Sequence, residues 1–206
     1  MKRIVCFVFF VTIFFTVRVV GNDHYQVVPI ESEFGDITEA LLFPALSDSL
    51  AILVHQYGGS KETWIGFAER LQKNNITALA IGNNGRRDVL DAVKYVQNTS
   101  NKKITLIGAS MGGGSVLQAA QDNPQQFHNI ILLSPIYSVV TGDQQLPKLF
   151  FVAKQDGWGA KAYDAYRDSD PPKKLMEYEG FAHGQALLSG EYAQEINQII
   201  IDFILK

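Results

Sequence analysis

Residues 103–122 read KITLIGASMGGGSVLQAAQD, and this stretch decides the fold class. Residues 103–109 form a short, largely apolar run, which is typical of a strand buried on both faces. Small and apolar residues continue the chain and predict a helix near 112–122. The junction, Gly108-Ala109-Ser110-Met111-Gly112, matches Gly-x-Ser-x-Gly. A serine on so sharp a strand-to-helix turn presents its hydroxyl at the edge of a sheet, as a nucleophile does.

Strand and helix patterns alternate on both sides of this junction. Two N-terminal strands, joined by a turn at Phe34-Gly35-Asp36, precede the alternating part of the chain. The predicted strands are residues 25–31, 37–43, 49–55, 76–82, 103–109, 129–134, 148–154 and 173–179. The predicted helices are residues 61–73, 87–97, 112–122 and 158–167, with a last amphipathic helix between Tyr192 and Ile204. This order predicts an α/β fold, with a mostly parallel sheet covered by helices on both faces and an active site at the carboxyl ends of the strands.

A serine hydroxyl needs a base, and His183 is the best candidate among the four histidines. It lies after the last predicted strand, between Gly180 and Gly184, in a loop that can reach the sheet edge. His24 lies near the N-terminus, and His128 precedes a strand, at the wrong end of the sheet. His55 ends a buried strand and is interpreted as a structural hydrogen-bonding residue.

Asp156 is the candidate for the acid that orients the histidine. It directly follows the apolar run 148–154, at the carboxyl end of a strand. The order Ser110, Asp156, His183 is the one expected for a nucleophile on this kind of turn. Two alternatives remain: Asp156 caps the following helix, or Asp143, in a connecting segment, is the acid instead.

The negative charge that develops on a substrate carbonyl needs two N–H donors. The backbone N–H of Met111, directly after the candidate nucleophile, is the first. The second is expected in the loop that follows strand 49–55, where Gly58 and Gly59 allow a close backbone approach. Tyr57 is the candidate donor there, and Gly58 is the alternative.

Composition excludes several classes of protein. The 206 residues are 47% hydrophobic and 19% charged, as in one globular domain, and the formal net charge of −3 makes nucleic acid an unsuitable partner. The only cysteine, Cys6, lies in the N-terminal segment, so residues 22–206 contain neither a disulfide nor a cysteine metal site. No metal ion and no organic cofactor is implied, and nothing in the sequence indicates an oligomeric state.

The N-terminal segment differs from the rest. Lys2 and Arg3 precede an apolar run from Ile4 to Val17, and Gly21 precedes a polar flank. These features predict a secretory signal peptide over residues 1–21, export to the periplasm or the medium, and a single domain over residues 22–206. The alternative is an uncleaved membrane anchor over residues 4–20, although a spanning helix needs about 20 apolar residues.

These motifs together resemble the α/β-hydrolase superfamily over nearly the whole chain after the N-terminal segment. Val54-His55-Gln56-Tyr57-Gly58-Gly59 is similar to the family's His-Gly-x-Gly oxyanion loop, with Gln56 in place of the usual glycine. Asp156 and His183-Gly184 resemble its acid and base motifs. The most similar type is the small lidless esterase, like dienelactone hydrolases but with serine as nucleophile. Only residues 136–147 separate Pro135 from the strand at 148, too few for a cap domain.

The resemblance implies a serine hydrolase, of carboxylesterase type, acting on a small or exposed ester through an acyl-enzyme. Three alternatives stay open: an acyltransferase or a peptidase with the same catalytic side chains, and a non-catalytic binding protein with this fold. The expected partner is a small ester or acyl substrate. Five apolar or aromatic side chains either line its pocket or belong to ordinary packing: Tyr57, Ile136, Tyr137, Trp158 and Leu187.

Overall fold

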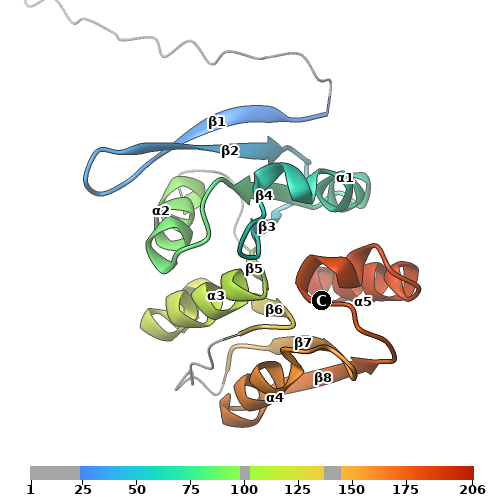
Figure 1. Cartoon of the computed structure of the whole chain (residues 1–206). Coiled ribbons are helices and arrows are strands. Elements are labelled where there is room, and N and C mark those ends of the chain that lie inside the picture. Colours follow the sequence, from blue (N-terminus) through green and yellow to red (C-terminus); the bar gives the residue numbers. More distant parts are fainter. Residues whose placement is uncertain (1–23, 98–102, 137–144) are drawn as a thin grey trace, which may run out of the picture.

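The computed structural model describes residues 24–97, 103–136 and 145–206, and these residues form an eight-stranded sheet with helices on both faces (Figure 1). The strands are β1 (Gln26–Glu31), β2 (Ile37–Phe43), β3 (Ser49–Val54), β4 (Thr77–Ile81), β5 (Lys103–Ala109), β6 (Asn129–Leu133), β7 (Lys148–Ala153) and β8 (Lys173–Tyr178). The α-helices are α1 (Ile65–Lys73), α2 (Arg86–Gln97), α3 (Met111–Asp122), α4 (Gly159–Asp168) and α5 (Ala193–Leu205). Short 3₁₀ helices are η1 (Lys61–Trp64), η2 (Pro124–Gln126) and η3 (Gly184–Leu188).

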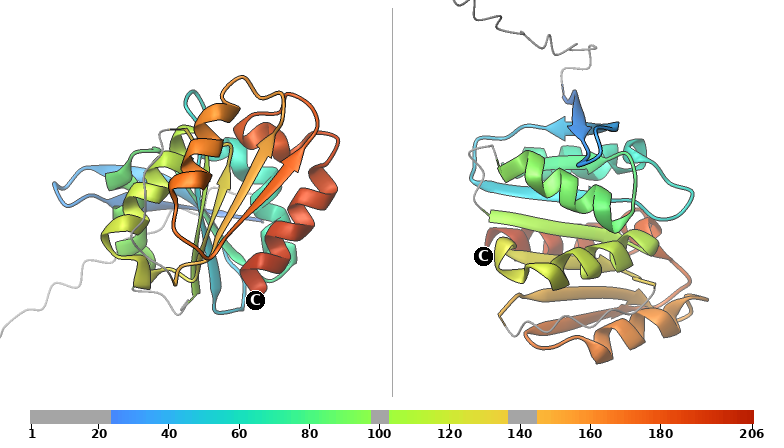
Figure 2. Two further views of the ribbon diagram at one scale, coloured as in Figure 1. Left: turned by 90° about the horizontal axis from the view of Figure 1, so that it is seen from below. Right: turned by 90° about the vertical axis from the view of Figure 1, so that its left-hand side faces the viewer.

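The strand order is β1-β2-β4-β3-β5-β6-β7-β8. The pairs β1–β2 and β2–β4 are antiparallel, and all later neighbours are parallel. The expected α/β architecture with a mostly parallel sheet is therefore confirmed. The strands rotate progressively across the sheet, so that β7 and β8 run in a very different direction from β1 and β2 (Figure 2, left). This is the usual twist of a parallel sheet.

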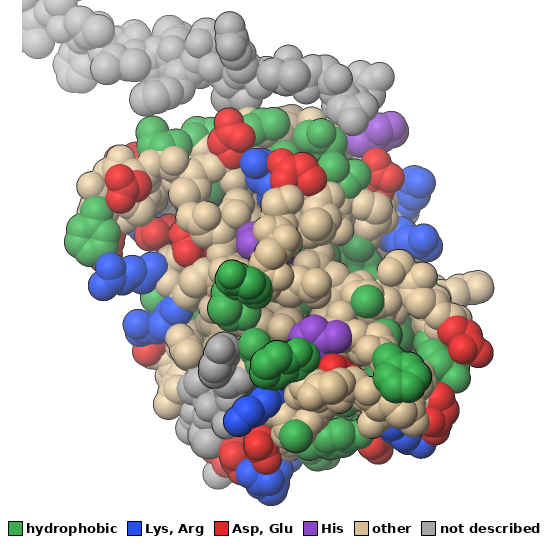
Figure 3. Space-filling model, in the orientation of Figure 1, with side chains coloured by type: hydrophobic (Ala, Val, Ile, Leu, Met, Phe, Trp, Pro, Cys, Tyr) green, Lys and Arg blue, Asp and Glu red, His purple; other side chains and the backbone are tan. Residues whose placement is uncertain are grey.

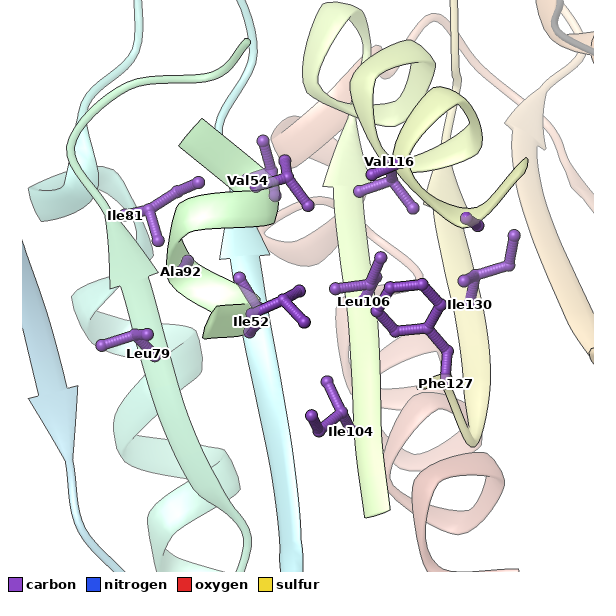
Figure 4. Close-up of a cluster of buried hydrophobic side chains, with 14 of the residues drawn as sticks. Ile52, Val54, Leu79, Ile81, Ala92, Ile104, Leu106, Val116, Phe127 and Ile130 are labelled. Carbon is purple, nitrogen blue, oxygen red and sulfur yellow. The ribbon is translucent and has the colours of Figure 1, made fainter. Parts of the chain in front are cut away.

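Two apolar layers hold the helices to the sheet. One layer contains side chains of α2, α3 and α4 and includes Ile52, Leu106 and Val116, which point toward one another between sheet and helices (Figure 4). The other layer contains side chains of α1 and α5, and includes Trp64, Ile196 and Ile200. The central strands are buried on both faces, which explains why they appear in the sequence as continuous apolar runs.

The predicted element boundaries differ from the observed ones at a few ends. His55 and Gly82 lie just beyond β3 and β4, where the chain leaves the sheet, and the predicted helix at 61–73 begins as the 3₁₀ turn η1. Of the N-terminal segment the structure describes nothing before His24, so the predicted signal peptide over residues 1–21 lies outside the described residues. Among the residues that are described, no helix is both long enough and apolar enough to cross a membrane.

Candidate active site

Ser110 occupies a strained turn between β5 and α3. Its φ is +51° and its ψ is −115°, a conformation that few non-glycine residues adopt. Neighbouring strands hold it there: its N–H donates to the carbonyl of Leu133 (2.9 Å), and its carbonyl accepts from the N–H of Ile136 (3.1 Å). Hydrogen bonds from β6 and the segment after it therefore maintain the turn that presents the hydroxyl.

The glycines on either side of Ser110 allow the helix to approach the sheet. A Cβ on Gly112 would lie 2.5 Å from the carbonyl oxygens of both Val54 and His55, at the end of β3. A Cβ on Gly108 would lie 2.5 Å from the carbonyl oxygen of Gly112. Real Cβ atoms do not approach backbone oxygens so closely, so the Gly-x-Ser-x-Gly spacing has a steric cause here.

The structure brings His183 to Ser110 from 73 residues further along the chain. The imidazole Nε2 lies 2.7 Å from the Ser110 Oγ, and Nδ1 lies 2.8 Å from the Asp156 Oδ2. Asp156 directly follows the carboxyl end of β7, and His183 follows that of β8. The three candidate side chains thus form one continuous hydrogen-bonded chain at the carboxyl edge of the sheet.

Both oxygens of the Asp156 carboxylate are engaged. Oδ2 faces the imidazole, and Oδ1 accepts a hydrogen bond from the N–H of Trp158 (2.9 Å) at the start of α4. The side chain is only 1% exposed, against 26% for His183. The N-cap residue of α4 is Trp158 and no side chain caps the helix, so the alternative in which Asp156 is the cap of α4 does not hold, whereas its contact with His183 is present. Asp143 lies outside the described residues.

Tyr57 and Met111 both line the pocket that opens onto Ser110. Across the described part of the chain, no acceptor is found for the backbone N–H of either residue. Gly58, the alternative donor, has a φ of +72° and lines a neighbouring groove instead. The lining of the pocket agrees with Tyr57 as the candidate second donor, and Gly58 stays the alternative.

The pocket has a volume of about 420 Å³ and a largely apolar wall. Its lining is Gln56, Tyr57, Ser110, Met111, Ile136, Trp158 and His183. Tyr57 and Trp158 are 80% and 60% exposed and border the pocket from the solvent side. On the face drawn in Figure 3, hydrophobic side chains stand around an exposed histidine, while acidic and basic side chains are interspersed elsewhere.

For Leu187 the packing alternative holds. Leu187 does not line the pocket at Ser110, because η3 turns its side chain into the core beside α5, where it is 2% exposed. Tyr137 lies outside the described residues.

His55 is buried and bridges two loops. Its Nδ1 lies 2.8 Å from the carbonyl oxygen of Gln56, and its Nε2 lies 3.1 Å from that of Gly82. These contacts fit the structural interpretation of His55. Among the described residues, no three histidine, cysteine or acidic side chains are grouped so that they could hold a metal ion.

Sequence comparison identifies the family. Residues 42–180, more than half of the chain, match the family model for putative esterases. The chain belongs to this esterase family. The family match spans β3 to β8 and includes Ser110 and Asp156. A search of curated proteins finds no match.

Solved structures with the same fold include other hydrolases. DcsB, solved with a substrate analogue, superposes with a TM-score of 0.75 at 16% identity, covering 88% of this chain and 99% of that one. The dienelactone hydrolase from Anabaena variabilis gives 0.73 at 17% identity, covering 88% and 96%. EstE1, a thermostable carboxylesterase from a metagenomic library, gives 0.72 at 13% identity, covering 88% of each chain. At such low identity these structures establish the α/β-hydrolase fold alone.

The sequence-based prediction missed the role of two glutamines. In the sequence, Gln56 is only a departure from the family pattern, and nothing marks Gln185. In the structure their side chains connect the loop after β3 to the loop that carries His183. The glutamine in place of glycine was the only signal in the sequence.

Proposed function

We propose that this esterase is a serine carboxylic ester hydrolase that works through an acyl-enzyme. The observation that carries the proposal is the hydrogen-bonded chain from Ser110 through His183 to Asp156, with distances of 2.7 and 2.8 Å. A serine with a histidine base and a buried carboxylate behind it is the arrangement that activates a hydroxyl for acyl transfer.

In the proposed mechanism, the Ser110 Oγ attacks the ester carbonyl while His183 Nε2 takes the hydroxyl proton. The carbonyl oxygen becomes negatively charged, and the N–H groups of Tyr57 and Met111 stabilise it. As the C–O bond to the alcohol breaks, His183 returns the proton to the leaving oxygen. Water then attacks the acyl-serine while His183 accepts its proton. The bond between the acyl carbon and the Ser110 Oγ breaks, His183 returns the proton to Oγ, and the acid leaves. Asp156 holds the imidazole in the tautomer that leaves Nε2 free to accept.

The pocket supports a small or solvent-exposed ester as substrate. Its apolar wall at Met111, Ile136 and Trp158 suits a hydrocarbon or aryl group, and its modest volume does not suit a long acyl chain. Tyr57 and Trp158 stand largely in solvent, so part of a bound ester can remain outside the pocket.

The test is hydrolysis of short p-nitrophenyl esters together with labelling by a fluorophosphonate. Ser110→Ala is expected to abolish labelling and to lower kcat by roughly 10⁶-fold, because the other parts of the site retain only a residual effect. Full esterase activity in Ser110→Ala would contradict the proposal. Labelling without hydrolysis would favour an acyltransferase or a peptidase, and neither labelling nor hydrolysis would favour a binding protein.

We also propose that residues 1–21 direct export. The charged start at Lys2 and Arg3, followed by an apolar run that is short for a membrane span, supports this proposal. The test is expression of the full chain followed by mass analysis of the exported protein. A first residue of Asn22 is expected, and an intact N-terminus in the membrane fraction would favour an anchor instead.

A further inference from the structure

Gln56 and Gln185 exchange hydrogen bonds between two loops of the site. The Oε1 of Gln56 accepts from the backbone N–H of Gln185 (2.9 Å), and the Oε1 of Gln185 accepts from the backbone N–H of Gln56 (3.3 Å). The two residues are 129 positions apart in the chain. Each glutamine side chain therefore provides an acceptor for a backbone N–H on the opposite loop. We call this pair of hydrogen bonds the reciprocal bridge.

The bridge lies next to residues that the mechanism uses. Gln56 directly precedes Tyr57, the candidate oxyanion donor, and lines the pocket with Ser110. Gln185 follows Gly184, which directly follows His183. A Cβ on Gly184 would lie 2.3 Å from the Gln56 Oε1 and 3.5 Å from the Ser110 Cβ, so the glutamine amide packs tightly against the histidine loop beside the nucleophile.

Further hydrogen bonds hold the two ends of the histidine loop. The Nε2 of Gln185 donates to the Thr63 hydroxyl (2.9 Å), which in turn donates to the Ser60 carbonyl. At the other end, the N–H of Gly180 donates to the Oε1 of Gln155, next to Asp156. The loop that carries His183 is thus held at one end by a hydrogen bond to the loop of Asp156, and at the other end by hydrogen bonds to the loop of Tyr57.

We propose that Gln56 is a positioning residue: through its reciprocal bridge with Gln185 it fixes the positions of the His183 loop and the Tyr57 turn relative to Ser110. The inference rests on the proposed acyl-transfer function. Acyl transfer requires the hydroxyl, the imidazole and the N–H donor to be aligned together, and small displacements lower the rate steeply. Gln56 is the side chain that contacts both the pocket and the histidine loop.

A positioning role and a stability role give different results. Both glutamines are half-buried, so the N–H groups freed by their loss can bind water, and the expected loss of stability is small. Water bound to these N–H groups cannot restore the alignment of His183 with Ser110. Loss of the bridge should therefore lower kcat in correctly folded molecules while the melting temperature changes little.

The experiment compares Gln56→Met, Gln185→Met and the double variant with the wild type. Methionine keeps the length of the side chain and removes the amide. The active sites are titrated with a fluorophosphonate, and kcat per titrated site, KM and the melting temperature are measured on one p-nitrophenyl ester. Gln198→Met is the matched control, because Gln198 is exposed on α5 and its amide donates to Asp202 on the same helix.

Each single variant is expected to lose kcat per titrated site on the order of 10- to 100-fold, with KM changed much less. The double variant is expected to lose less than the product of the two single losses, because the two bonds act as one unit. Gln198→Met should match the wild type. Unchanged kcat per site in both single variants, or losses that multiply in the double variant, would overturn the bridge while leaving the proposed function intact.

Failure of the proposed function is recognised separately. If the wild type neither hydrolyses esters nor reacts with the fluorophosphonate, both proposals fall. If Gln56→Met does not fold, Gln185→Met still tests the bridge, because the backbone N–H of residue 185 and the whole of Gln56 remain. A lower number of titrated sites with normal kcat per site would assign the glutamines a stability role and contradict the inference.

Discussion

At the scale of single residues, the carboxylate of Asp156 orients the base His183 in the proposed mechanism. It is almost fully buried, and its hydrogen-bond partners among the described residues are the imidazole of His183 and the N–H of Trp158. Asp156→Asn preserves the shape but offers an amide where the imidazole needs a charged acceptor. We expect kcat to fall about 10⁴-fold with little change in KM, because the wrong tautomer of His183 is favoured.

The control for this substitution is Asp164→Asn. Asp164 pairs with Arg167 on the exposed surface of α4, where such pairs contribute little. The measurement is kcat and KM of both variants on the same ester. An Asp156→Asn enzyme with wild-type kcat would show that another group orients the histidine.

His128 is expected to make folding sensitive to mild acid. Burial, and to a lesser extent the positive charge of Lys103, lower the pKa of this imidazole below its ordinary value, while Asp48 opposes the shift. The unfolded chain therefore binds a proton at His128 at a higher pH than the native chain does. Stability is complete above the unfolded value of about 6.5 and declines as the pH falls below it.

We therefore expect His128→Gln to flatten the decrease in melting temperature between about pH 7 and pH 5. Melting curves across that range provide the measurement. His24→Gln, which removes an exposed imidazole instead, is the control. If the two variants show the same pH dependence as the wild type, His128 does not contribute to acid sensitivity.

At the scale of elements, the contact between α3 and β3 determines where the nucleophile stands. Gly112→Ala would place a methyl group against two backbone carbonyls that cannot move independently of β3. The helix must shift, and Ser110 moves with it. We expect a loss of stability of roughly 1–3 kcal/mol or more and loss of esterase activity.

Gly66→Ala is the matched control for this prediction. Gly66 lies in α1, and a Cβ there would meet nothing within 4 Å. Alanine is the better helix former, so this variant should be as stable as the wild type or slightly more stable. Chemical denaturation of both variants decides the point, and equal stability of Gly112→Ala and Gly66→Ala would contradict the steric argument.

The elements that the sequence predicts well are those with a local physical cause. Buried parallel strands such as β5 and β7 appear as apolar runs, and the Ser110 turn needs its two glycines. The strand order, with β4 beside β2 rather than beside β5, depends on long-range pairing that no local pattern encodes. The inward turn of Leu187 and the bridge from Gln185 to Gln56 lie in irregular loops, where periodicity carries no information.

At the scale of the whole molecule, the groups of the site come from the ends of different strands. Tyr57 follows β3, Ser110 follows β5, Asp156 follows β7 and His183 follows β8. None of these groups can keep its place unless the sheet between them is intact. The site is thus a property of the assembled sheet, which explains why its members are spread over most of the chain.

The unusual backbone of Ser110 has a consequence for how this esterase fails on heating. An isolated peptide would relax out of a conformation with φ of +51°, since the long-range bonds to Leu133 and Ile136 and the docking of α3 help to maintain it. We expect heat inactivation and loss of circular dichroism to share one midpoint when scanned together. Esterase activity would then report the folded fraction at each temperature. A population that is fully folded but inactive would contradict this expectation.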